Sequence, residues 1–397
     1  MKLKLLSLFI LLNYLSAFSC SFYKITKFGK TYVGNNVDNW DSNTRIWFEK
    51  GNTTEYGTMF FGFENLYPQG GMNEKGLVYG GLSVTPRANL KGKHLLEFDG
   101  RVVMRKIMKE CKNVDEVYKV LSKYNRTPIG DGELYFVDKA GDYLIVEVDT
   151  IIRGNEENYL ISNFCPSKTP DLNAVNIPFY QKGKKMMSTK VDTSFNYLKS
   201  LSDTLHQSYV NNAGGTLYTA IYDLDEGTFN LFFYHDYNYS LKFNLKNELS
   251  KKDTVISIPV LFNSNIKGQE QFKKYNKTKQ LMDIIKEKDM SQDSVILAKY
   301  IRDEEIGSFI NFFEKDIYFL AYDFLKKNNK NSAINLFKLN IKYCPYSWYS
   351  YNSLGNVYFS DKQYALALIY YKKTLEFNSE NENALKKIKK IEKRLKN

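Results

Sequence analysis

The stretch Ala17–Trp40 organises the rest of the chain, and it reads Ala-Phe-Ser-Cys-Ser-Phe-Tyr-Lys-Ile-Thr-Lys-Phe-Gly-Lys-Thr-Tyr-Val-Gly-Asn-Asn-Val-Asp-Asn-Trp. It begins at the end of an export signal and finishes in a predicted strand that carries Asp38. If the signal peptide is cut after Ser19, Cys20 becomes the first residue of the mature chain. A thiol and a free α-amino group then share one residue, which supplies a nucleophile together with its base.

The region before Cys20 has the three parts of a secretory signal peptide. Lys2 and Lys4 make the start positive, Leu5–Leu15 is apolar, and Ala17 and Ser19 place small residues at −3 and −1 of the cut. We therefore expect residues 1–19 to be removed and the mature protein to be exported, periplasmic or extracellular, and soluble. The alternative is a lipoprotein signal anchoring Cys20, although such signals usually have Leu at −3 and a small residue at −2.

The amino-acid composition of the chain limits the classes of protein to which it can belong. Of 397 residues, 43% are hydrophobic and 15% aromatic, which is enough for packed cores. The formal charge of +12 is concentrated in part over residues 386–396, which we interpret as a solvated basic helix face. Because no nucleic-acid-binding motif accompanies it, we expect no nucleic-acid partner, and a weak contact with an anionic membrane surface is the remaining alternative.

The sequence predicts neither a metal site nor a cofactor. It holds no HExxH motif, no cluster of cysteines and histidines, and no phosphate-binding glycine loop. The three histidines, His94, His206 and His235, lie in no catalytic signature, so a Cys–His dyad is disfavoured. Four cysteines form no CxxC pair, and nothing in the sequence supports a bridge between Cys111 and Cys165.

Periodicity divides the mature chain into three parts. Residues 20–266 alternate predicted strands (22–25, 31–33, 45–49, 59–63, 134–137, 143–148, 217–224, 229–235) with predicted helices (100–111, 114–124, 195–206). Runs of strands separated by helix pairs favour α+β layers over a doubly wound parallel sheet. Residues 267–312 are polar with helical spacing and are interpreted as a helical connector.

Residues 313–397 predict a different, all-α architecture. The residues Ala321, Ala333, Phe337 and Pro345 recur about 34 positions later as Gly355, Ala367, Tyr371 and Ser379. Small residues at these positions let two antiparallel helices approach closely, and the pattern resembles two tetratricopeptide repeats closed by a basic capping helix. Such repeats suggest a protein or peptide partner.

Three further motifs follow Cys20 in order: Gly34–Trp40, Arg45–Phe48 and Pro68–Leu77 (Pro-Gln-Gly-Gly-Met-Asn-Glu-Lys-Gly-Leu). The ordered set resembles the linear amide C–N hydrolases, which comprise choloylglycine hydrolase, penicillin V acylase and the acyl-CoA:isopenicillin N acyltransferase-like proteins, carcinine hydrolase-like members included. The resemblance covers about Cys20–Ile266. It implies an N-terminal nucleophile hydrolase with an αββα sandwich and a small-molecule amide substrate.

The resemblance assigns three catalytic residues. Cys20 would be the nucleophile, with its own α-amine as base, and Asp38 would bind and hold that amine. Asn163 follows a strand at the place of an oxyanion-binding asparagine, a contribution worth about 3 kcal/mol in comparable sites. No autoproteolysis is needed, because signal peptidase would expose Cys20.

Ser83, Asn35 and Asn73 are weaker candidates for oxyanion or substrate binding. Ser83 replaces the usual Asn or Tyr of the second oxyanion contact, so a backbone N–H is expected to act there. Asn35 stands where the bile-salt hydrolases have a catalytic arginine, and the arginine expected near residues 180–182 is missing. These departures disfavour bile salts and penicillins as substrates.

Two functional hypotheses follow. The first is an exported hydrolase of a linear, non-peptide amide that works through a Cys20 acyl-enzyme, with acyl transfer to an amine as a variant. The second is a non-catalytic, exported or lipid-anchored repeat protein whose hydrolase-like domain is degenerate. The state of the Cys20 α-amine separates them, because an acylated amine cannot act as a base.

The first prediction concerns that amine. Intact mass and N-terminal sequencing of the protein exported by its native host should give a chain that starts with unmodified Cys20, because Ala17 and Ser19 meet the small-residue requirement of signal peptidase. A diacylglyceryl-modified Cys20, or a start at another residue, would contradict this prediction and leave no N-terminal base.

Overall fold

The fold is described from a computed structural model, which covers residues 20–39, 41–84, 95–130, 132–189, 191–207, 215–262, 266–287 and 314–395. The predicted signal peptide, and residues 288–312 of the predicted connector, lie outside the described residues. The chain divides into two compact units, one ending at Phe272 and the other beginning at Lys273.

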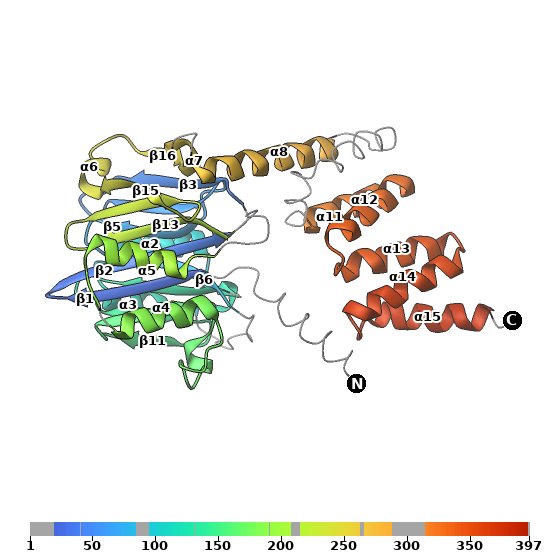
Figure 1. The fold of residues 1–397 in the computed structure, drawn as a ribbon, viewed down its shortest axis with the longest axis horizontal. Coiled ribbons are helices and arrows are strands. Elements are labelled where there is room, and N and C mark those ends of the chain that lie inside the picture. Colours follow the sequence, from blue (N-terminus) through green and yellow to red (C-terminus); the bar gives the residue numbers. More distant parts are fainter. Residues whose placement is uncertain are drawn as a thin grey trace. The chain divides into compact units, whose positions relative to one another are not determined.

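The first unit is built on two antiparallel sheets (Figure 1). The six-stranded sheet has the order β12 (Asn158–Ser162), β1 (Ser21–Lys27), β2 (Lys30–Asn39), β13 (Gly215–Asp223), β14 (Thr228–Phe233), β15 (Asp236–Asn244). The eight-stranded sheet has the order β11 (Ile151–Gly154), β10 (Tyr143–Val146), β9 (Gly132–Val137), β6 (Val78–Ser83), β5 (Pro68–Asn73), β4 (Thr58–Phe63), β3 (Thr44–Glu49), β16 (Thr254–Ser257).

Helices cover the outer face of each sheet. Side chains from both sheets form a common core between them, which includes Phe22, Val33 and Tyr135. Helices α2 (Gly100–Glu110) and α3 (Val114–Leu121) pack on the eight-stranded sheet, and α4 (Pro178–Thr189) and α5 (Phe195–Leu205) pack on the six-stranded sheet. The order helix, sheet, sheet, helix confirms the predicted αββα sandwich.

Strand β1 shows why sequence periodicity predicted where the strands lie in the chain but not which face of the sheet each side chain occupies. Phe22 points into the core between the sheets, whereas Tyr23 and Ile25 pack under α4 and α5. A strand that is buried on both faces needs apolar residues at successive positions and loses the usual alternation. The predicted strands and helices of this unit are present, except that the second predicted helix ends at Leu121 and its last residue, Tyr124, lies in a short strand.

Strands β5 and β6 carried no strand prediction because glycines replace β-branched residues in them. The two sheets and their strands approach too closely there for a side chain. A Cβ atom on Gly71 would lie 2.3 Å from the Met59 carbonyl oxygen, and one on Gly80 would lie 3.0 Å from Asn35 Nδ2. Glycine weakens a strand intrinsically, so tertiary packing decides these two strands.

Shorter elements complete the first unit. They are β7 (Leu96–Glu97), β8 (Tyr124–Asn125), two 3₁₀ turns (Thr127–Ile129 and Pro166–Lys168), α6 (Leu245–Leu249) and α7 (Ile258–Leu261). The 21-residue helix α8 (Lys267–Glu287) follows them. Helix α8 continues past Phe272 and forms the described part of the predicted connector. All four cysteines are free, so Cys111 and Cys165 are not bridged.

The second unit consists of paired helices. They are α11 (Glu314–Lys326), α12 (Lys330–Tyr343), α13 (Trp348–Ser360), α14 (Tyr364–Phe377) and α15 (Glu382–Leu395). Each odd-numbered helix begins 34 residues after the previous one, at Glu314, Trp348 and Glu382. Ala321, Ala333, Phe337, Ala367 and Tyr371 are all fully buried. This spacing equals the length of a tetratricopeptide repeat, and the identity of the repeats stays a prediction. Within the described part of the chain, no helix combines the length and the apolar character needed to cross a membrane.

Gly355 provides a test of this helix packing. Alanine normally stabilises a helix interior by about 0.5–1 kcal/mol relative to glycine. A Cβ on Gly355, however, would lie 2.7 Å from two ring carbons of Tyr371. Gly355→Ala should therefore destabilise the repeat unit by about 1–3 kcal/mol, measured by thermal unfolding of the full chain.

The Tyr371→Leu background is the control for that variant. Without the ring, the same Gly355→Ala change should cost less, so the two substitutions should be non-additive. A higher melting temperature for Gly355→Ala alone would show that α13 and α14 do not approach closely at this position.

Candidate active site

The sulfur of Cys20 is held by the main chain of Asp38. Cys20 directly precedes β1, and β1 pairs antiparallel with β2, with Ser21 opposite Asn36. The Asp38 N–H donates to Cys20 Sγ at 3.3 Å, and the thiol donates to the Asp38 carbonyl oxygen at 3.7 Å. The pairing of the two strands in this hairpin therefore fixes the position of the thiol independently of the other residues of the site.

The Asp38 carboxyl group is buried beside this contact, with a 2% exposed side chain. Strand β13 lies next to β2 with Thr216 opposite Asp38, and the Thr216 hydroxyl donates to Asp38 Oδ1 at 2.5 Å. Oδ2 has no hydrogen-bond partner among the described residues. Buried carboxylate oxygens normally accept a hydrogen bond, and an ammonium group would provide the donor that Oδ2 lacks.

Burial dominates the electrostatics of both groups. It raises the pKa of Asp38 well above its usual range, while the hydrogen bond from Thr216 acts in the opposite direction. Burial, followed by the charge of Asp38, raises the pKa of the Cys20 thiol to about 12. The thiol is therefore protonated at neutral pH, and a base next to it is required before it can act as a nucleophile.

A short chain of polar groups connects Cys20 with Asn163. Ser162, the last residue of β12, donates its hydroxyl to the Cys20 carbonyl oxygen at 2.9 Å and lies 3.3 Å from Asn163 Oδ1. Asn163 Nδ2 in turn donates to the Ser83 carbonyl oxygen at 2.5 Å. The structure thus brings Cys20, Asn163 and Ser83 together from three separate strand ends.

Cys20, Asp38 and Ser83 line a cavity of about 440 Å³. Its other walls come mainly from apolar residues, and the complete set is Val37, Asn39, Phe63, Tyr67, Pro68, Gln69, Gly81, Leu82, Phe98, Met104, Pro128, Ile129, Gly132, Glu133 and Leu134. A mostly apolar cavity with few polar groups suits a small organic ligand, and the Cys20 thiol lies in its wall.

Asn35 and Asn73 do not line this cavity. Asn35 is buried between the sheets, where its Nδ2 faces Gly70 and Gly80. Asn73 donates both amide hydrogens to carbonyl oxygens at the end of α2, those of Met108 and Cys111, at 2.8 Å each. Asn73 therefore stabilises the end of α2, and the buried Oδ1 of Asn35 has no hydrogen-bond partner among the described residues.

The histidines lie away from the cavity. The rings of His206 and His235 stack on each other with centroids 5.2 Å apart, and neither residue lines the cavity. His94 lies outside the described residues. The described geometry therefore offers no histidine partner for Cys20.

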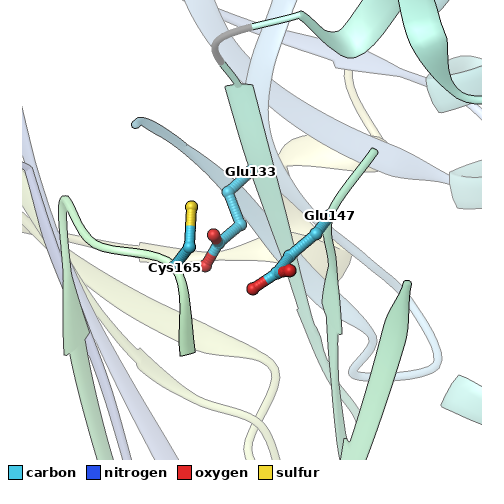
Figure 2. A group of neighbouring side chains, drawn as sticks. All are labelled: Glu133, Glu147 and Cys165. Atoms are coloured by element: carbon cyan, nitrogen blue, oxygen red, sulfur yellow. The ribbon is translucent and has the colours of Figure 1, made fainter. Parts of the chain in front are cut away.

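A second group of ionisable side chains lies next to the cavity: Glu133, Glu147 and Cys165. Figure 2 shows the three side chains pointing toward one another from β9, from the end of β10 and from the loop after β12. Their ligand atoms lie within 4.8 Å of one another, and both glutamates are buried. Two carboxylates and a thiol could hold a metal ion, and Glu133 also lines the cavity.

Sequence reasoning missed Thr216, Ser162 and Glu133. Thr216 meets Asp38 only through strand pairing across 178 positions, for which no local signal exists. Glu133 lies 113 positions after Cys20 in a strand of the other sheet. Ser162 alone had a signal, because a Ser-Asn pair at a strand end places two polar side chains where strands meet the site.

The sequence of the chain matches one family of known proteins. A family model described as acyl-coenzyme A:6-aminopenicillanic acid acyl-transferase matches residues 29–236, about half of the chain. No curated protein matches the sequence significantly.

Two solved structures are similar to the first unit. A mutant conjugated bile acid hydrolase from Clostridium perfringens has a TM-score of 0.48 and 16% identity, covering 60% of this chain and 96% of that one. Penicillin V acylase from Agrobacterium tumefaciens has a TM-score of 0.45 and 16% identity, covering 54% and 82%. At these values neither likeness bears on the substrate or the reaction.

The Thr216→Val variant tests whether the hydrogen bond from the Thr216 hydroxyl lowers the pKa of the buried Asp38 carboxyl group. Loss of the hydroxyl donor should raise the pKa of Asp38 further, so a larger fraction of Asp38 should be neutral at a given pH. Because the charge of Asp38 raises the pKa of the Cys20 thiol, alkylation of Cys20 by iodoacetamide should then become faster in a chain that starts at Cys20. In the pH range where Asp38 titrates, the alkylation rate should rise by up to about tenfold, because a hydrogen bond to a charged group is worth about 1.5–3 kcal/mol.

Thr219→Val is the matched control for this experiment. Thr219 lies in the same strand, but its hydroxyl donates to Asn36 Oδ1 at 2.8 Å instead of to Asp38. Identical pH profiles for the two variants would show that Thr216 does not tune Asp38.

Proposed function

Because the chain belongs to the acyl-coenzyme A:6-aminopenicillanic acid acyl-transferase family, we propose that it cleaves a linear, non-peptide amide through a Cys20 acyl-enzyme. One observation carries this proposal. The Cys20 sulfur is fixed between the N–H and the carbonyl of Asp38, in the wall of a largely apolar cavity. Water would release the acid from the thioester, and an amine in its place would make the reaction an acyl transfer.

The free α-amine of Cys20 is the base in this proposal. Its pKa near 7.7–8.0 leaves a useful unprotonated fraction at neutral pH, and it can take the thiol proton directly or through one water. After proton transfer the ammonium would meet Asp38, whose Oδ2 lacks a partner in the described structure. The buried carboxylate would thereby gain the positive charge that its environment lacks.

The carbonyl oxygen of the substrate becomes an oxyanion when the thiolate attacks. Asn163 Nδ2 carries two hydrogens, and one of them is used on the Ser83 carbonyl oxygen. The second would stabilise the oxyanion, and a backbone N–H beside Ser83 would complete the pair of donors. When the C–N bond breaks, the Cys20 ammonium returns its proton to the departing amine.

Export is part of the proposal, because the mechanism needs residues 1–19 to be removed. While they remain, the nitrogen of Cys20 belongs to a peptide bond and cannot accept a proton. The protein would therefore become active only after signal peptidase acts, in the periplasm or outside the cell. A peptide or protein partner for the helical repeats is proposed on their spacing alone.

A second candidate function is a non-catalytic binding protein. Cys20 is only 8% exposed and burial disfavours its thiolate, which is compatible with an inert thiol. Phe319 and Ile369 of the repeat unit are 62% and 57% exposed, so their apolar side chains would be accessible to a partner. A lipid-modified Cys20 would favour this candidate.

Substitution of Cys20 tests the two candidates. Turnover of a panel of acyl-amides by the mature chain should fall by at least about a thousandfold in Cys20→Ala, because the nucleophile is lost. Cys20→Ser should also be impaired, since a hydroxyl is harder to deprotonate than a thiol. Trapping of the acyl group on residue 20, detected by mass spectrometry, provides a direct measurement.

The control is Cys165→Ala, which removes the half-buried thiol near the cavity and leaves Cys20 in place. It should retain turnover. Activity that survives in Cys20→Ala, or that disappears only in Cys165→Ala, would defeat the proposed mechanism.

A further inference from the structure

Helix α15 carries a concentration of positive charge that the proposed reaction does not use. One side of the helix packs on α13 and α14, and there Ala384 and Ile391 are 0% exposed. At 3.6 residues per turn, the basic residues lie away from that side, over an arc of about 160°. This basic face consists of Lys386, Lys387, Lys389, Lys390, Lys393 and Arg394.

Few acidic groups balance these charges. Lys386 pairs with Glu382 at 2.8 Å, one turn earlier in the helix, and Glu392 lies outside the basic arc. The remaining cations of the basic face form no ion pair with any residue that the structure describes. Asp361, in the turn between α13 and α14, pairs with Lys330 of α12 instead. The basic face therefore keeps a positive charge that an anionic partner would meet.

At one edge of the basic face, three cations gather around a single aromatic ring. The Lys387 and Lys390 ammonium groups lie 4.1 Å and 5.9 Å from the centroid of Phe359. The central guanidinium carbon of Arg394 lies 5.7 Å from the same centroid, and this guanidinium also donates to the Tyr364 hydroxyl. Positive charges gathered in this way repel one another, and an anionic group among them would replace that repulsion by attraction.

The shape of the basic face favours an extended anionic surface over a peptide. The helix has 14 residues and is about 21 Å long, and Lys386, Lys389 and Lys393 lie on the side turned away from the Phe359 ring. Peptides are usually bound in a groove or along a strand edge, whereas a layer of lipid phosphates can meet the convex outside of a helix along its length. The apolar side of α15 is already occupied by packing, so the attraction would be electrostatic and would need no insertion of the helix.

We infer that the basic face of α15 docks the protein on an anionic bilayer surface, with lipid phosphates as its contacts. Lys387, Lys390 and Arg394 would share one headgroup phosphate, and the cations on the outer side of the helix would meet neighbouring headgroups. Each lysine or arginine close to such a surface strengthens binding about fivefold. The inference is independent of the proposed function, because α15 belongs to the second unit of the chain and Cys20 to the first.

Vesicle binding by the chain that starts at Cys20 tests this inference, because the apolar stretch within residues 1–19 would itself enter a bilayer. The chain is mixed with vesicles of phosphatidylcholine alone or of phosphatidylcholine with phosphatidylglycerol, and the bound fraction is measured by flotation. At low salt, partitioning onto the phosphatidylglycerol vesicles should be at least about tenfold stronger. It should fall steeply as salt is raised, because the screening length shortens to about 3 Å at 1 M.

The double variant Lys390→Gln/Lys393→Gln should weaken binding to the phosphatidylglycerol vesicles by at least about tenfold, because two of the contributing charges are removed. Glutamine is a good helix former, so α15 should stay folded, which circular dichroism checks. The matched control is Lys182→Gln/Lys185→Gln, because these two lysines have the same spacing and are exposed on α4 in the first unit. The control has the same net charge and should bind within about threefold of the unchanged chain, since charges distant from the bilayer are screened.

Three results would each overturn the inference: equal binding to the two kinds of vesicle, no binding to either, or equal weakening in the two double variants. Binding to polyglutamate or to duplex DNA without binding to phosphatidylglycerol vesicles would also overturn it, and would assign the basic face to another class of partner. Turnover of acyl-amides in solution without vesicles tests the proposed function separately, so failure of either leaves the other standing.

Discussion

The contact between Cys20 Sγ and the main chain of Asp38 is the constraint on which the site depends. It is a consequence of the pairing of β1 with β2, so the thiol is positioned by backbone hydrogen bonds that no side-chain substitution can easily remove. The remaining groups reach it from other strands. β13 brings Thr216 to the Asp38 carboxyl group, and β12 brings Ser162 to the Cys20 carbonyl.

The burial of the Asp38 carboxyl group makes the stability of the fold depend on pH and on nearby cations. The folded protein raises the pKa of this carboxyl group above its unfolded value, so the group contributes stability at low pH and loses that contribution as pH rises. At neutral pH an ionised Asp38 therefore opposes folding unless a cation meets it. A free Cys20 ammonium would supply that cation in the mature chain, and the precursor has no such group at this position.

The αββα sandwich has a closed interior and a cavity lined by residues at its strand ends and loops. Its interior is closed by aromatic stacking, such as Phe22 on Tyr135, and by glycines that let strands approach closely. The cavity opens where strand ends and loops meet, and there the wall residues differ in charge and size. Glu133 lies along the cavity wall, but its side chain is 0% exposed and its carboxylate accepts a hydrogen bond from Tyr135 in the core.

Local patterns in the sequence determined the hairpin of Cys20 and Asp38 and the 34-residue period of the helices, whereas the strand before Asn163 was expected only from the family resemblance. The first two features rest on turn residues, apolar periodicity and spacing, which act over short distances along the chain. Only the tertiary structure decided the glycine-rich strands β5 and β6, the pairing of Thr216 with Asp38, and the position of Glu133 in the cavity wall. Asn73 shows the reason: a buried amide can bind a ligand or cap a helix, and the packing of α2 against its strand turn makes it a cap.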